Sequence, residues 1–177
     1  MKNIFILFTI LIASMSVYGQ RHYDGVGAIS FSGGFNVNRG NTPYGQISFN
    51  KYLGRSSYYK IGLNYMQADF AAIDSVGTRL ERRSHDYFLD LSHLWTLFTD
   101  GNYVFFNLGF GGFTGIQTYK DAKNRFRYFA GAKAEMETEI FISRRIGLLV
   151  GAQQYWNPMS IHRWNTTAYA GLRILLY

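Results

Sequence analysis

The chain has 177 residues, which suits one domain and leaves too little for two domains of ordinary size. Its 15 Phe, 14 Tyr and 19 Gly beside only 2 Pro are typical of a sheet protein, and the absence of Cys excludes disulfides, thiolate-bound metals and a lipidated N-terminal cysteine. The net charge of +7 is not concentrated in one segment. We therefore expect the basic residues at turns and rims that face an anionic lipid surface, and we expect no direct binding of nucleic acid.

The first residues have the pattern of a secretory signal peptide. Lys2 supplies a positive charge, residues 4–13 form an apolar run, and Val-Tyr-Gly at residues 17–19 resembles a cleavage site. The run is too short for a helix that crosses a bilayer, which needs about 20 apolar residues, and no later segment resembles such a helix. The sequence therefore predicts a cleaved signal peptide at residues 1–19 and one mature domain at residues 20–177.

The first three segments after the signal peptide alternate with a period of two. Residues 28–37 place large apolar side chains at most odd positions and small or polar ones between them, and residues 46–50 and 59–65 repeat the pattern. Turn-forming residues at 38–43 and 54–57 separate the segments. The pattern predicts three strands, each with one apolar face.

The middle of the chain adds two more strands. We expect the polar stretch from Asp69 to Arg83 to be an exposed loop, followed by a strand at residues 86–95. The Asp-Gly pair in the stretch 99–102 favours a hairpin turn into a fifth strand at residues 104–111. Residues 117–125 are then expected to form a second exposed loop.

The sixth segment, residues 128–142, carries four charges on one face: Lys133, Glu135, Glu137 and Glu139 alternate with apolar residues. Strands at residues 146–155 and 168–176 follow, with a loop at residues 157–164 between them. The total is about eight strands, and the connections are short and long in turn, which is the layout of a small outer-membrane barrel.

A soluble eight-stranded carrier would alternate too, so the period alone does not decide the solvent. The strands are about ten residues or longer, the polar face is small and charged, and the chain ends on a strand. Its Tyr169-x-Gly171-x-x-Ile174-x-Leu176 pattern, followed by Tyr177, resembles the signal that the barrel-assembly machinery recognises. We predict an all-β, antiparallel up-and-down transmembrane β-barrel in the outer membrane, with lipid against its apolar face.

Closure of such a barrel puts the charged face inside. We predict a salt-bridged interior network formed by Lys60, Asp86, Asp90, Lys133, Glu135, Glu137, Glu139 and Arg173. Aromatic residues near strand ends are candidates for the headgroup level, although ordinary cross-strand packing explains each of them equally well. They are Tyr44, Tyr52, Trp95, Trp156 and Trp164.

The sequence gives little support for a catalytic function. Carboxylates two residues apart on one strand lie about 7 Å apart, which suits neither a shared proton nor a compact metal shell. Ser84-His85 and Ser92-His93 suggest a lipid-modifying enzyme, but neighbours on a strand point to opposite faces, and no G-x-S-x-G motif occurs. His162 is read as a surface histidine. We expect no catalytic, cofactor or metal site.

The C-terminal part, residues 126–177, carries Tyr-Phe-Ala-Gly at 128–131, Glu135-x-Glu137, Ser143-x-Arg145, Trp156 and Ala-Gly-Leu-Arg at 170–173. In these motifs it resembles the TraO family of conjugal transfer proteins of conjugative transposons. The resemblance implies a non-enzymatic outer-membrane component of a DNA-transfer apparatus that acts with other transfer proteins. Two alternatives remain open: a stand-alone surface barrel for adhesion or envelope integrity, and an outer-membrane lipid-modifying enzyme.

Overall fold

The computed structural model describes residues 24–73, 79–100, 103–119, 126–159 and 163–176. The predicted signal peptide, Tyr177 and His162 lie outside these residues. The strands are β1 (Asp24–Asn36), β2 (Thr42–Leu53), β3 (Ser57–Ile73), β4 (Arg79–Thr99), β5 (Val104–Tyr119), β6 (Phe126–Phe141), β7 (Ile146–Trp156) and β8 (Trp164–Leu176), and a short 3-10 helix covers Val37–Arg39.

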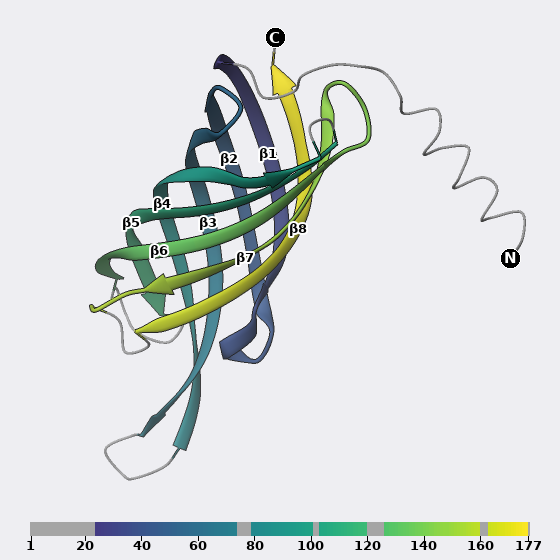
Figure 1. Cartoon of the computed structure of the whole chain (residues 1–177). Helices are drawn as coiled ribbons and strands as arrows, with labels where there is room; N and C mark the ends of the chain where they lie inside the picture. The colour runs from purple at the N-terminus through teal and green to yellow at the C-terminus, as the bar shows by residue number, and fades with distance from the viewer. Residues whose placement is uncertain (1–23, 74–78, 101–102, 120–125, 160–162, 177) are drawn as a thin grey trace, which may run out of the picture.

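The eight strands form a closed antiparallel barrel in chain order (Figure 1). Each strand pairs with the next, and β1 closes the sheet by pairing with β8 from Gly27↔Leu176 to Asn36↔Thr167. Closure leaves no open sheet edge around the barrel wall, which is the condition for a sheet in hydrocarbon because an unpaired amide there costs several kcal/mol. The prediction of an eight-stranded up-and-down barrel is confirmed.

The period of two sorts side chains between the outer and inner faces as predicted. Large apolar side chains on the outer face are about half exposed, as at Ile47 (53%), Leu63 (58%) and Leu89 (55%). Their neighbours along the strands face inward and are buried. An apolar wall around a charged interior is the inverse of a soluble barrel, and it suits a lipid solvent.

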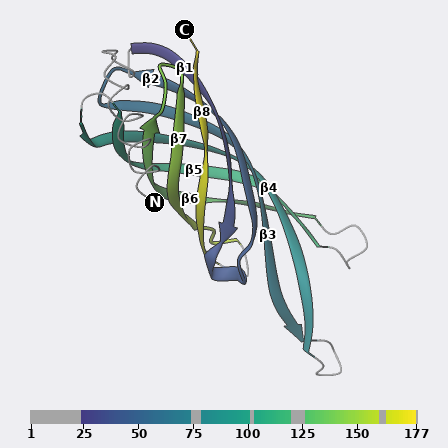
Figure 2. The same ribbon diagram turned by 90° about the vertical axis from the view of Figure 1, so that its right-hand side faces the viewer.

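The two ends of the barrel differ. One end, called here the terminal end, holds the start of β1, the end of β8 and the connections β2–β3, β4–β5 and β6–β7. The other end, called the loop end, holds the connections β1–β2, β3–β4, β5–β6 and β7–β8. Figure 2 shows β3 and β4 reaching well past the other strands at the loop end.

This extension corrects the predicted loop at residues 69–83. Residues 69–73 belong to β3 and residues 79–83 to β4, and they pair with each other up to Ile73↔Arg79. Polar residues there suggested a loop, but a hairpin outside the lipid has no apolar face to display. The predicted loop at 117–125 is wrong at its start, because β5 continues to Tyr119, and its residues 120–125 lie outside the described residues.

The aromatic residues near strand ends divide into two groups. Trp95, Trp156 and Trp164 lie on the outer face and are between 42% and 56% exposed. Tyr44 and Tyr52 are buried inside the barrel, with exposed fractions of 4% and 0%, so the headgroup position is wrong for both. Their even numbers place them on the inward face of β2, opposite to Ile47 and Phe49.

Candidate functional site in the barrel interior

The interior is built in three layers along the barrel axis. At the terminal end, seven buried residues pack together: Ala28, Tyr52, Tyr58, Leu94, Phe105, Phe141 and Leu175. A second cluster lies toward the loop end: Tyr44, Met66, Phe88, Phe113, Phe129, Tyr155 and Tyr169. Charged residues occupy the middle layer between these two clusters. The described residues therefore fill the interior with side chains, as expected for a barrel of this strand number.

Strand β6 supplies four of the seven charged residues of the middle layer. Lys133, Glu135, Glu137 and Glu139 occupy alternate positions, so all four point inward, and each is at most 3% exposed. Lys60 comes from β3, Asp90 from β4 and Arg173 from β8. Strands β3, β4 and β8 thus add three further charged groups to the four on β6.

Two lysines bridge the carboxylates of the middle layer. Lys60 Nζ lies 3.2 Å from Glu135 Oε2 and 3.1 Å from Glu137 Oε2. Lys133 Nζ forms an ion pair with Asp90 and lies 3.3 Å from Glu135 Oε2. Each lysine therefore forms ion pairs with two carboxylates, which compensates for the loss of water around its ammonium group.

Arg173 connects the carboxylates of Glu137 and Glu139 with the apolar layer at the terminal end. Its two terminal nitrogens lie 2.6 Å from Glu137 Oε1 and 3.0 Å from Glu139 Oε2. Its Nε donates to Ser30 Oγ at 2.9 Å, and its guanidinium lies 5.1 Å from the centre of the Tyr58 ring. A planar guanidinium with five donors fits such a site better than an ammonium group does.

Neutral donors complete the acid shells, and sequence reasoning did not assign these roles. Ser92 Oγ and Gln153 Nε2 donate to Glu135, at 2.6 and 2.8 Å. Tyr58 and Tyr169 hydroxyls donate to Glu137 at 2.7 and 2.9 Å. Position parity along each strand marks these side chains as inward, but the partner of each depends on the register between distant strands.

Asp86 does not join the predicted network. It lies beyond the apolar layer toward the loop end, where Gln117 Nε2 donates to its Oδ1 at 2.8 Å. The remaining seven predicted residues form one connected cluster of three cations and four carboxylates. Within it, Asp90 Oδ1 has no hydrogen-bond partner.

The serine and histidine pairs have separate surroundings. Ser92 is buried against Glu135, whereas the His93 ring faces outward, 4.6 Å from the Tyr59 ring and 4.4 Å from the Trp95 ring. Ser84 Oγ donates to the Ala68 carbonyl, and His85 Nδ1 is bonded to the Tyr65 hydroxyl outside. Each serine and its neighbouring histidine thus lie on opposite faces of the wall.

Among the described residues, no group of three or more His, Cys, Asp or Glu side chains is placed to hold a metal ion. No described helix is long and apolar enough to cross a membrane.

Comparison with solved structures places this architecture among known barrels. The outer membrane protein OprG from Pseudomonas aeruginosa matches with a TM-score of 0.64 and 9% identity, over 89% of this chain and 99% of that one. The N-terminal barrel domain of Pseudomonas aeruginosa OprF gives 0.61 and 10%, over 86% and 98%. The fold is that of the eight-stranded outer-membrane barrels.

A third similar structure is Ail, the attachment invasion locus protein of Yersinia pestis, in complex with the heparin analogue sucrose octasulfate. It matches with a TM-score of 0.54 and 10% identity, over 86% of this chain and 99% of that one. No protein-family model matches the sequence, and no curated protein is significantly similar to it. At these identities the likeness establishes the fold alone.

Proposed function

We infer that the protein is a non-enzymatic barrel of the outer membrane that serves as a component of a conjugative DNA-transfer apparatus. The observation that carries this proposal is the combination of a filled interior with a hairpin that extends beyond the barrel. Such a molecule is suited to anchoring and presenting a surface, and less to passing solutes or performing a reaction. The TraO-like residues of the C-terminal part supply the link to conjugation.

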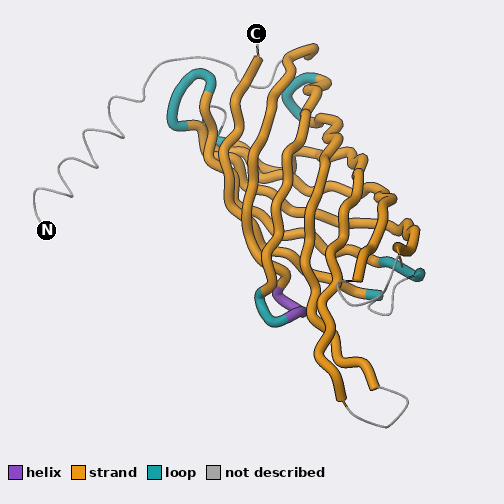
Figure 3. Tube along the Cα trace, turned by 180° about the vertical axis from the view of Figure 1, so that it is seen from behind, coloured by secondary structure: helices purple, strands orange, loops and turns teal. Residues whose placement is uncertain are grey.

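The extended part of the β3–β4 hairpin is the candidate contact surface. Among the described strand pairs, β2 reaches only Met66 of β3, and β5 reaches only Ser84 of β4. Residues 67–73 and 79–83 therefore form a two-stranded ribbon, called here the ribbon, which projects from the loop end (Figure 3). A two-stranded ribbon is marginally stable alone, and its free edges are ready to pair with another chain.

Barrels of this type place their short turns in the periplasm and their longer connections outside the cell. The terminal end then faces the periplasm, and the ribbon faces outward. In this orientation its partners are outer-membrane lipid around the wall, other transfer proteins at the ribbon, and the barrel-assembly machinery at β8 during insertion.

Mating assays test the proposal. Deleting the gene is expected to lower the transfer frequency, and unchanged transfer would refute a role in conjugation. A second variant replaces residues 70–82 by Asn-Gly between Asp69 and Arg83, which pair directly in the ribbon and suit a two-residue turn. It should keep the heat-modifiable gel mobility of a folded barrel and still lose at least tenfold in transfer. Normal transfer by this variant would exclude the ribbon as the contact.

A stand-alone surface barrel for adhesion or envelope integrity is the second candidate, because the projecting ribbon is equally suited to contact a surface outside the cell. Normal transfer together with reduced attachment or reduced detergent tolerance of the deletion strain would support this alternative. The enzyme reading has weaker support, because each Ser-His neighbour pair is divided between the two faces of the wall.

A further inference from the structure

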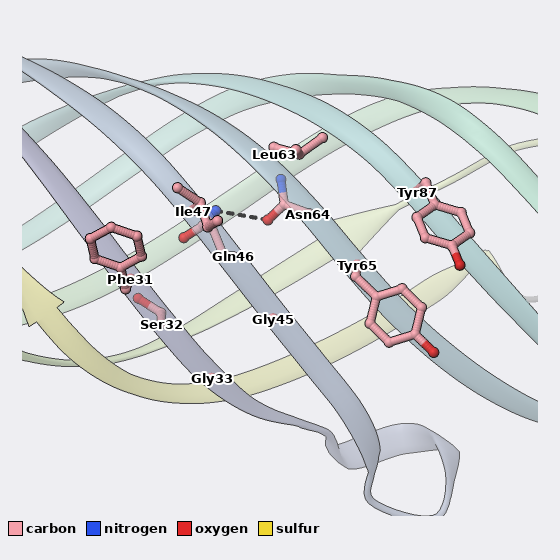
Figure 4. A pocket seen from close by; sticks show the side chains of 10 residues that line it. All are labelled: Phe31, Ser32, Gly33, Gly45, Gln46, Ile47, Leu63, Asn64, Tyr65 and Tyr87. Atoms are coloured by element: carbon pink, nitrogen blue, oxygen red, sulfur yellow. Dashed lines mark hydrogen bonds between the residues drawn. The ribbon is translucent and has the colours of Figure 1, made fainter.

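The outer wall of the barrel has a hollow that the packing of the barrel does not require. It lies over β1–β4 on the loop-end half of the wall, has a volume of about 560 Å³, and is lined by Phe31, Ile47, Leu63, Tyr65 and Tyr87 (Figure 4). Its floor is formed by Gly33 and Gly45. These two glycines are directly opposite each other in the β1–β2 register, so two adjacent strands lack a side chain at the same height.

Neither glycine is needed for its backbone or for close packing. Neither residue has a positive φ angle, and a Cβ atom added at either position would meet nothing within 4 Å. Two inward-facing strand glycines differ sharply: a Cβ at Gly131 would lie 2.0 Å from the Trp156 carbonyl, and one at Gly171 would lie 2.2 Å from the Phe31 carbonyl. Glycine weakens a strand, so its pairing at positions 33 and 45 indicates a use for the space outside the wall.

The hollow has an apolar part and a polar edge. Phe31, Ile47 and Leu63 border it toward the middle of the wall. The Tyr65 hydroxyl at the loop-end side is bonded to His85 Nδ1 at 2.8 Å, and the next outward residue of β4, Arg83, is exposed and paired with Asp69. From the middle of the wall toward the loop end, the side chains thus change from apolar ones through tyrosine and histidine rings to a charged pair within a few residues, as at a membrane interface.

The excess of positive charge at the loop end favours a lipid with an anionic headgroup. Among the described residues of this end, the exposed basic side chains of Arg83, Arg127 and Arg163 outnumber the exposed acidic side chain of Asp69. An excess of basic groups beside an interface attracts anionic headgroups. The volume of the hollow also lies within the range of small-ligand sites, about 300–1,000 Å³.

We propose that this hollow is a binding site for a phosphorylated, acylated lipid of the outer leaflet. One acyl chain lies over Gly33 and Gly45 between Phe31 and Tyr65, and the phosphate lies at the level of His85 and Arg83. The proposal rests on the membrane location inferred above and goes beyond it, because it assigns a specific lipid to one side of the wall.

The test uses the full mature barrel in mild detergent and counts bound lipid by native mass spectrometry. The probes are bisphosphorylated lipid A, dephosphorylated lipid A and phosphatidylcholine. The wild type is expected to retain one bisphosphorylated lipid A, with at least tenfold preference over the other two. The variant Gly45→Leu fills the hollow and should weaken this retention at least tenfold. Arg83→Gln should remove the preference for the phosphorylated form.

Gly112→Leu is the matched control. Gly112 also faces outward, on β5 and away from the hollow, and a Cβ there would meet only the Gly131 carbonyl at an ordinary 3.5 Å. This variant should retain lipid A as the wild type does. Equal retention by Gly45→Leu, equal loss in Gly112→Leu, or no lipid preference in the wild type would overturn the site. A dimer that disappears in Gly45→Leu would also overturn it, in favour of a second copy as the occupant.

Failure of the site differs from failure of the location. A mature chain that remains monodisperse in buffer without detergent would refute the membrane location itself. Loss of the lipid preference in a chain that still requires detergent would refute the lipid site alone.

Discussion

Glu137 is the residue on which the interior network depends most. Four donors converge on its carboxylate: the Lys60 ammonium, the Arg173 guanidinium, and the hydroxyls of Tyr58 and Tyr169. The group is fully buried, so no water replaces a lost partner. Removal of its charge would leave two cations without their shared anion, which is the most destabilising change in a buried ion pair.

Glu137→Gln is therefore expected to lower the free energy of unfolding by about 3–5 kcal/mol. Equilibrium urea unfolding of the barrel in lipid vesicles, followed by tryptophan fluorescence, measures the change. Arg83→Gln is the control, because the Arg83–Asp69 pair is exposed to solvent, where an ion pair contributes little to stability. Similar losses in the two variants would show that burial of the network does not matter for stability.

At the scale of elements, the strand glycines mark which face of the sheet is crowded. A Cβ at Gly131 would meet the Trp156 carbonyl at 2.0 Å and the Phe113 ring at 2.6 Å, and one at Gly151 would meet the Met136 carbonyl at 2.6 Å. These backbone atoms cannot move away without breaking the hydrogen bonds between neighbouring strands. The inward glycines therefore allow the strands to curve closely around large aromatic side chains.

Gly131→Val and Gly45→Val are expected to act in opposite directions. The first should prevent formation of the heat-resistant barrel band, because the added side chain overlaps the backbone of β7. The second should raise the free energy of unfolding in detergent by about 0.5–1 kcal/mol, since a β-branched residue replaces a strand glycine with space around it. Refolding followed by gel mobility and urea titration distinguishes them. Folding of Gly131→Val to wild-type stability would contradict the assigned register.

The whole molecule has two chemically different ends, and its orientation in the membrane determines which partners it meets. Met159 is exposed at the loop end, and Arg55 is exposed in a turn at the terminal end. The chain has no native Cys, so a single introduced cysteine at either position reports its own accessibility.

In intact cells, Met159→Cys is expected to react with a membrane-impermeant maleimide, and Arg55→Cys is expected to react only after the outer membrane is permeabilised. The physical reason is that a barrel inserts with its short turns in the periplasm. Labelling is read by gel shift on the isolated barrel. The reverse pattern would place the ribbon in the periplasm and require different partners for it.

The sequence alone determined the features that depend on single strands. Alternation along each segment predicted the strands, the apolar outer face and the inward position of the charges, because side-chain direction changes sides at every residue whatever the neighbours are. The same parity also assigns Tyr44 and Tyr52 to the interior; their places near strand ends suggested the headgroup level instead.

Only the tertiary structure decided the features that depend on pairing between strands. The ribbon exists because β3 and β4 continue to pair beyond the last residues that pair with β2 and β5. The sequence pattern of one strand does not show where its neighbouring strand ends. Asp86 and Asp90 share the inward face of β4, yet only Asp90 meets a lysine. Height along the barrel axis decides such contacts, and the register of all eight strands sets that height.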